Sequence, residues 1–208
     1  MTPALGSVRG MATEEADNHA TALDRARALA DPLRLVLLHA ITVDGPLTTA
    51  ELKTRFPESR GALNFDLKDL AQCGHITQVE SDPPTWAAQP GSMNWDDAML
   101  RDPETAAAVA ELDRVVIQTR INRTRDWMNH RKAWGPEWGD VSLSADWLAR
   151  MTPTELDAMR VELEQVARKH RRSAMQAREN DPNPEETRPV FVFLMGFPCR
   201  LGEVEEPG

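Results

Sequence analysis

The chain has 208 residues, 41 % of them hydrophobic, and a formal net charge of −9, which allows one ordinary domain or a small domain with a substantial extension. It contains no apolar run near the roughly 20 residues of a membrane span, and its negative charge argues against a protein that coats nucleic acid non-specifically. The N-terminal residues lack the apolar centre of a secretion signal, and the two cysteines, Cys73 and Cys199, form no CxxC motif. We therefore expect a cytoplasmic protein with no disulfide framework and no membrane partner.

The N-terminal part is predicted to be a tail followed by two helices. Residues 1–20 are expected to be a disordered tail. Apolar residues recur at helical spacing from Asn18 to Ala30, which predicts a first helix. Asp31 before Pro32 has the form of an N-cap with proline at the first helical position, so a second helix is expected from Pro32 to about Val43.

A pair of short helices is predicted next. Thr48 and Glu51 have the spacing of a capping box, which starts a third helix at Thr48. After a break at Pro57, Ser59 is expected to cap a fourth helix that turns its leucines inward and ends at Gly74. The alternating segment "HITQVE", the turn "SDPP" and the segment "TWAAQ" then predict a β-hairpin.

The remainder of the chain is predicted to be mostly helical. Asp102 and Pro103 begin a long helix that reaches about His130, and "WGPEWGD" breaks the pattern. A short helix is expected from Ser144 to Arg150, and a second capping box at Thr152 starts a helix that runs to about Arg178. The Val/Phe-rich "RPVFVFLMGFP" predicts a buried terminal β-strand.

Two stretches resemble a known family. "RALADPLRLVLLHAI" resembles the entry of the ArsR-like winged-helix regulators, and "LTTAELKTRFPESRGALNFDLKDLAQCGHI" resembles their helix-turn-helix, so the resemblance covers roughly residues 22–90. The C-terminal part, with "MTPTEL" and "RPVFVFLMGFP", is similar to extensions of actinobacterial members. The resemblance implies a cytoplasmic, dimeric, DNA-binding transcription regulator.

The expected fold is mainly α. It comprises a disordered tail (1–20), a winged helix-turn-helix domain with a small β-hairpin wing (21–90), a helical dimerisation region with a terminal β-strand (91–200) and an acidic tail (201–208). Long amphipathic helices at about 103–132 and 153–178 would expose much apolar surface in a single copy, which favours a homodimer.

The predicted DNA contacts lie on the two helices of the helix-turn-helix. The second helix of such a motif enters the major groove, where arginine pairs with guanine and asparagine with adenine. The preceding helix meets phosphates. The candidate contacts to double-stranded DNA on the second helix are Ser59, Arg60, Gly61, Asn64, Phe65 and Lys68, and those on the preceding helix are Thr48, Thr49 and Arg55.

The charge pattern leaves an alternative open. No lysine or arginine occurs from Asp69 to Leu100, although cations supply much of the affinity for DNA. Asp66, beside the expected contacts, would either accept a hydrogen bond from cytosine or weaken binding. The arginines of segment 114–132 either supply the cations that the hairpin lacks, or they pair with neighbouring acidic segments within the dimer or face solvent. The alternative function is a winged-helix protein-interaction module that has lost its affinity for DNA.

Other kinds of site have less support in the sequence. Four tryptophans lie close together in the sequence: Trp127, Trp134, Trp138 and Trp147. They either pack a core or line a candidate pocket for an effector of unknown identity. No cysteine lies on the helix predicted at Thr48 and no histidines pair at i, i+4, so no metal site is expected. No phosphate loop, nucleophile elbow or HExxH motif is present, so neither an enzyme nor a cofactor is expected.

Overall fold

The structure, a computed structural model, describes residues 22–59, 61–91, 98–180 and 187–199. The chain divides into two compact units, Met1–Ala133 and Trp134–Gly208. The described residues are mainly helical and contain one small antiparallel sheet, which confirms the expected mainly α class. The tails expected at 1–20 and 201–208 lie outside the described residues. None of the described helices combines the length and apolarity needed to cross a membrane.

The second and third helices of the first unit begin at the predicted caps, whereas the predicted start of the first helix at Asn18 lies outside the described residues. A helix covers residues 22–29, and α2 (Pro32–Asp44) follows. The Asp31 side chain accepts hydrogen bonds from the backbone amides of Leu33 and Arg34, at 2.8 and 3.1 Å. At α3 (Thr49–Arg55), the side chain of Thr48 and that of Glu51 form both halves of the predicted capping box. Local hydrogen bonds to the first helical turn thus account for both starts.

The fourth helix does not begin where the sequence predicts. Residues Pro57–Ser59 form a 3₁₀ helix, η1, and α4 (Leu63–Gln72) begins four residues after Ser59. The Ser59 hydroxyl donates to the carbonyl oxygen of Phe56 at 2.9 Å, and the residue is only 4 % exposed. The prediction that Ser59 caps the helix is therefore wrong, because burial directs its hydroxyl to the preceding turn.

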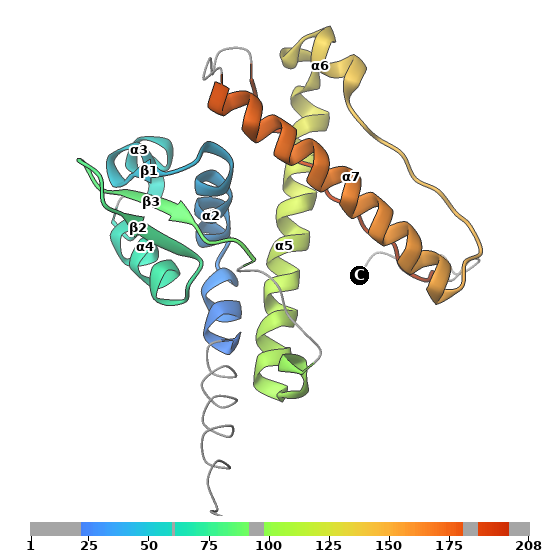
Figure 1. Ribbon diagram of the computed structural model, residues 1–208, viewed down its shortest axis with the longest axis horizontal. Coiled ribbons are helices and arrows are strands. Elements are labelled where there is room, and N and C mark those ends of the chain that lie inside the picture. Colours follow the sequence, from blue (N-terminus) through green and yellow to red (C-terminus); the bar gives the residue numbers. More distant parts are fainter. Residues whose placement is uncertain (1–21, 60, 92–97, 181–186, 200–208) are drawn as a thin grey trace, which may run out of the picture. The chain divides into compact units, whose positions relative to one another are not determined.

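The predicted hairpin is present as strands β2 (Ile76–Val79) and β3 (Thr85–Ala88), which pair antiparallel. A third strand, β1 (Leu47–Thr48), pairs with the other edge of β3, so the sheet has the order β1-β3-β2. In Figure 1 the sheet lies beside α3 and α4, with α2 next to it. In chain order the unit thus has the helix at 22–29, α2, the short strand β1, α3, α4 and the hairpin β2–β3, and a long helix follows the hairpin.

The long helix α5 (Pro103–His130) belongs to the first unit and begins at Asp102, as predicted. Its first turns bury Ala108 and Val109 against Ala26 of the helix at 22–29. One turn later, Leu112 enters the main core of the unit. That core consists of apolar side chains from every layer of the unit: Leu29, Leu37, Leu38, Ile41, Leu52, Leu63, Leu67, Leu70, Ile76 and Leu112. Burial of these side chains stabilises the packing of α5 on α2.

One contact between α2 and α5 predicts sensitivity to acid. Nδ1 of His39 lies 3.1 Å from a guanidinium nitrogen of Arg123, and burial together with that positive charge lowers the pKa of His39 from 6.5 to about 4. Between those pH values the unfolded chain binds more protons than the folded chain. We therefore expect the free energy of unfolding to fall by up to about 3 kcal/mol as the pH drops from 6.5 to 4.

Urea unfolding of the wild type and of His39→Asn at pH 7 and pH 4.5 tests this expectation. The asparagine variant keeps a hydrogen-bond acceptor but cannot take up the proton, so it should lose much less stability on acidification. Some loss should remain, because burial also lowers the pKa of His75. An equal loss in both proteins would contradict the assignment to His39.

The described residues of the second unit form two α-helices. A 3₁₀ helix, η3 (Arg131–Trp134), leads into α6 (Pro136–Val141), which begins with proline at its first position. The long helix is interrupted here, as predicted, but Pro136–Val141 form a helix that the sequence did not predict. The helix expected from Ser144 to Arg150 is absent. The side chains of Ser144–Arg150 are exposed, so no packing offsets the cost of starting a single helical turn. The second helix, α7 (Pro153–Asn180), begins at the predicted capping box of Thr152 and Glu155.

The predicted terminal strand is also absent. Residues 187–199 form neither helix nor strand, and their large apolar side chains are 41–67 % exposed. Gly196 packs beside Leu156 of α7, and the rings of Phe191 and Phe193 lie 5.7 Å apart. The prediction of a buried strand is wrong because β propensity alone makes no ladder, and no described strand of this unit offers an edge to pair with.

Candidate nucleic-acid interface

The helix α4 turns its leucines inward, as predicted. Leu63, Leu67 and Leu70 are fully buried, whereas Asn64 and Lys68 are exposed one turn apart on the outer face. Gly61, in the turn before the helix, is exposed as well, and a side chain built there would meet nothing within 4 Å. Arg60, a predicted base contact, lies outside the described residues. The outer face of α4 can thus present an amide and an ammonium group to a partner.

Phe65 stands beside these polar groups with 66 % of its surface exposed. The guanidinium carbon of Arg34, on α2, lies 5.7 Å from the centre of its ring, within the range of a cation–π contact. Phe65 therefore combines a large exposed apolar surface with a fixed partner on the neighbouring helix. An aromatic ring held in this way can meet an apolar group such as the methyl of thymine.

Asp66 does not face outward with Asn64 and Lys68. It is buried, at 6 % exposure, and its Oδ1 accepts a hydrogen bond from Nε of Arg34 at 3.0 Å. Nη1 of the same guanidinium donates to Oδ2 of Asp69, one turn further along α4. The expectation that Asp66 would contact or repel DNA is therefore corrected: its charge is used inside the unit.

The predicted phosphate contacts already have partners in the chain. The Thr48 hydroxyl donates to the Glu51 carboxylate within the capping box, at 2.7 Å. The Thr49 hydroxyl accepts a hydrogen bond from the indole nitrogen of Trp86, at 3.0 Å. Arg55 is paired with Asp44. A phosphate that bound the Thr48 hydroxyl or Arg55 would compete with the internal bond. The Thr49 hydroxyl, which accepts from Trp86, could still donate its own hydrogen to a phosphate.

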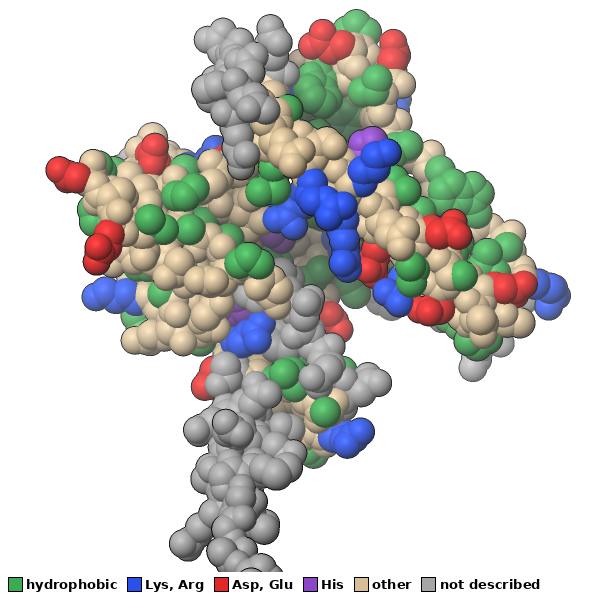
Figure 2. All heavy atoms as spheres, in the orientation of Figure 1, with side chains coloured by type: hydrophobic (Ala, Val, Ile, Leu, Met, Phe, Trp, Pro, Cys, Tyr) green, Lys and Arg blue, Asp and Glu red, His purple; other side chains and the backbone are tan. Residues whose placement is uncertain are grey.

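The hairpin that follows α4 presents no positive charge among its described residues. Red acidic side chains mark its tip, at the far left of the molecule in Figure 2, and the sequence places Glu80 and Asp82 there. Exposed cations occur near the end of α5 and in η3, at Arg125, Arg131 and Lys132. Arg123, by contrast, is half-buried against His39. The candidate interface on α4 therefore has little support from charges on the hairpin itself.

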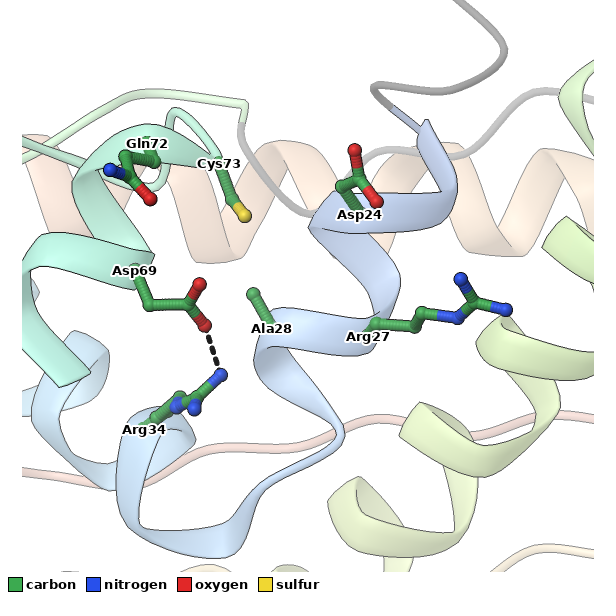
Figure 3. Close-up of a pocket in the computed structure, with 7 residues that line it drawn as sticks. All are labelled: Asp24, Arg27, Ala28, Arg34, Asp69, Gln72 and Cys73. Carbon is green, nitrogen blue, oxygen red and sulfur yellow. Dashed lines mark hydrogen bonds and ion pairs between the residues drawn. The ribbon is translucent and has the colours of Figure 1, made fainter. Parts of the chain in front are cut away.

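A hollow of about 350 Å³ adjoins the inner side of α4 (Figure 3). The Arg34–Asp69 pair forms one wall, while Asp24 and Ala28 of the first helix face Cys73 across it. Burial and the charges of Asp69 and Asp24 raise the pKa of the Cys73 thiol, so its reactive thiolate is less populated than in water. This disfavours a redox role for Cys73.

The four tryptophans of the candidate effector pocket belong to different units. Trp127 is half-buried on α5 of the first unit, and the other three lie in the second unit. There, Trp138 is half-buried, whereas Trp134 and Trp147 are 40 % and 73 % exposed. None of them lines the hollow beside α4. The pocket that they were expected to form stays a prediction.

His75 is a buried residue to which the sequence analysis assigned no role. Its ring is fully buried, and Nε2 lies 2.9 Å from the carbonyl oxygen of Arg25, which ties the end of α4 to the first helix. A lone histidine after a helix stop gives no sequence signal for this contact. Within the described ranges, no group of three histidine, cysteine, aspartate or glutamate residues could hold a metal ion.

The comparisons with known proteins do not identify the chain. No family model, no curated protein and no solved structure matches it. The geometry of α4 and its surroundings is therefore the basis of the functional argument.

Proposed function

We propose that the chain is a transcription regulator that binds operator DNA selectively through α4. The first unit would act as a winged helix-turn-helix, with α3 and α4 as the helix pair and β2–β3 as the wing. The predicted contacts on the outer face, Asn64 and Lys68, would meet the major groove together with Phe65. Arg60 and Gly61 stay proposed contacts from the preceding turn.

One observation supports this proposal most directly. The order α2, β1, α3, α4, β2, β3, with β3 between the other two strands, is the order expected of a winged helix. In such a module the second helix of the motif meets base edges, and here that helix leaves an amide and an ammonium group free of leucine packing. A helix with only a structural role would not need this face to combine an asparagine, a lysine and an exposed phenylalanine.

The proposal includes a homodimer. Ile117, Ile121 and Met128 are exposed on α5 at spacings that place them on one helical stripe. This stripe differs from the face that buries Val109 and Leu112. Two copies that packed this stripe together would remove it from water and present two α4 helices to two half-sites.

Selection from a random library of double-stranded DNA tests the function for any operator sequence. A regulator should enrich a two-fold symmetric sequence and bind it more tightly than scrambled DNA, with a steep dependence of affinity on salt. The salt slope also counts the phosphates that are contacted. Failure to enrich any sequence at low salt would contradict the proposal.

Replacing Asn64 by alanine should then reduce affinity for the enriched sequence by roughly 5- to 150-fold, which corresponds to about 1–3 kcal/mol for a good base contact. Affinity for scrambled DNA should change little, since Asn64 carries no charge. Fluorescence anisotropy measures both. Gln72→Ala is the matched control, because Gln72 is an exposed amide at the far end of the same helix. An equal loss in both variants would argue against base recognition by Asn64.

A second candidate function is a protein-interaction module. It is favoured by the acidic hairpin tip and by the exposed apolar side chains of residues 187–199. Such a module would keep its partner when Asn64 is replaced, and it would lose the partner when the apolar segment is made polar. The library selection distinguishes the two functions, because only the regulator enriches DNA.

A further inference from the structure

We propose that Arg34 is a positioning residue that sets the orientation of α4 against α2 and thereby the selectivity of the DNA contact. This inference rests on the proposed function for its consequence, but the orientation of α4 can be measured without DNA. Arg34 belongs to α2 and is not itself a predicted base contact, but its guanidinium lies near the ring of Phe65, which is one.

The geometry of the contact is unusual for one side chain. Nε of Arg34 donates to Asp66, Nη1 donates to Asp69, and the guanidinium plane lies near the ring of Phe65. The two carboxylates are three residues apart and therefore share one face of α4. A single planar group thus contacts the first and second turns of the helix at once.

Apolar packing does not impose the same constraint. The leucines of α4 insert into a core of other apolar side chains, and the hydrophobic effect that holds them there is non-directional, so it restricts rotation of the helix less sharply than hydrogen bonds do. A guanidinium has donors in a rigid fork, so its two hydrogen bonds hold only over a narrow range of helix orientations. The three Arg34 contacts therefore select one of the orientations that the leucine core permits.

The environment of the three groups strengthens this selection. The Arg34 side chain is 18 % exposed, and those of Asp66 and Asp69 are 8 % and 28 % exposed. Oδ2 of Asp66 is buried without a hydrogen-bond partner among the described residues, so this carboxylate depends on Arg34. Burial alone lowers the pKa of Arg34, but the hydrogen bond to Asp66 and the charge of Asp69 outweigh it and raise the pKa above its usual value. The guanidinium therefore stays charged.

The consequence for DNA follows from the position of the contact. Asn64 and Lys68 flank Asp66 on the same two turns of α4, so a rotation that breaks the Arg34 contacts also moves both predicted DNA contacts. Phe65 would lose the partner that holds its ring. Buried ion pairs often add little net stability, because desolvation offsets their attraction. A role in orienting α4 would explain why a buried Arg34–Asp66 pair is present here.

The test is the double variant Arg34→Met, Asp66→Leu, which replaces the buried pair by apolar side chains of similar size and leaves Asp69 to solvent. Such replacements commonly preserve folding, so the variant should unfold cooperatively near the wild-type midpoint. Its ratio of affinities for the enriched and scrambled DNA should fall at least about fivefold, which corresponds to the loss of one base contact. A folded double variant that keeps this ratio within about twofold would overturn the inference.

A second measurement separates this inference from the proposed function. Residual dipolar couplings of the backbone amides report the orientation of α4 relative to α2 in the absence of DNA. We expect a changed orientation in the double variant and an unchanged one in Arg27→Met, an arginine of the first helix that pairs with Glu104 on the surface. The same orientation in the wild type and the double variant would overturn the role of Arg34. A wild type that enriches no DNA would overturn the proposed function alone.

Discussion

Arg34→Met should lower the free energy of unfolding by about 3 kcal/mol. Removing one partner of a buried ion pair commonly costs about 3–5 kcal/mol, because it leaves the other charge buried without compensation. The lower end applies here, since 18 % of the Arg34 side chain is exposed and water can reach part of the site. Asp66 would keep a buried carboxylate with one oxygen already unpartnered among the described residues and the other newly so.

Urea unfolding at pH 7 measures this loss, and two variants sharpen its interpretation. Arg27→Met is the same substitution at an arginine whose ion pair, with Glu104 at 3.5 Å, is exposed to solvent. It should therefore lower the free energy of unfolding by less than about 0.5 kcal/mol. Adding Asp66→Leu to Arg34→Met should recover most of the stability, because the most deeply buried carboxylate is then gone and the unpaired Asp69 side chain, at 28 % exposure, still reaches water. A double variant no more stable than Arg34→Met would show that the loss comes from packing of the arginine side chain.

Leu112→Ala should also destabilise the first unit, by about 2–5 kcal/mol. Leu112 is 2 % exposed and is the buried residue of α5 in the main core, which also holds buried side chains of α2 and α4. Its truncation removes buried apolar surface and leaves a cavity that the neighbouring leucines fill only in part. Because the same core carries α4, the loss should appear as one cooperative transition of the whole unit.

Ile121→Ala is the matched control on the same helix. Ile121 is 44 % exposed, so its truncation should change the free energy of unfolding of the unit by less than about 1 kcal/mol. In the proposed dimer the same change should weaken association, which sedimentation over a range of protein concentrations would detect. Equal destabilisation by the two variants would mean that α5 does not pack on the unit through the Leu112 face.

The parts of the fold that follow from short-range chemistry could be predicted from the sequence. Each of four helix starts has a side chain that accepts a hydrogen bond from a backbone amide within three residues: Asp31, Thr48, Asp102 and Thr152. The local sequence is therefore enough to predict where these helices begin. The hairpin likewise follows from alternation on either side of a proline-containing turn. The inward leucines of α4 follow from their spacing alone.

The same short-range chemistry predicted the wrong structure where burial or pairing with another element determines the conformation. Ser59 has the form of an N-cap, but it is buried and its hydroxyl donates to the nearby carbonyl oxygen of Phe56, so α4 begins only at Leu63. Residues 187–199 have strong β propensity and form no strand, because a strand needs an edge to pair with. The two-residue strand β1 escaped prediction for the converse reason: it exists only through its pairing with β3.

At the candidate site, the outer face of α4 follows from the sequence, since a helical period sorts Asn64 and Lys68 from the leucines. The same period puts Asp66 beside the leucines, but a charged side chain is ordinarily expected on the surface. Its burial depends on tertiary packing, because its partner Arg34 lies 32 positions earlier in the chain and belongs to another helix. Packing can bury a carboxylate when a cation from another part of the chain neutralises its charge. The burial of Asp66 therefore depends on a contact between two helices and not on the sequence of α4 alone.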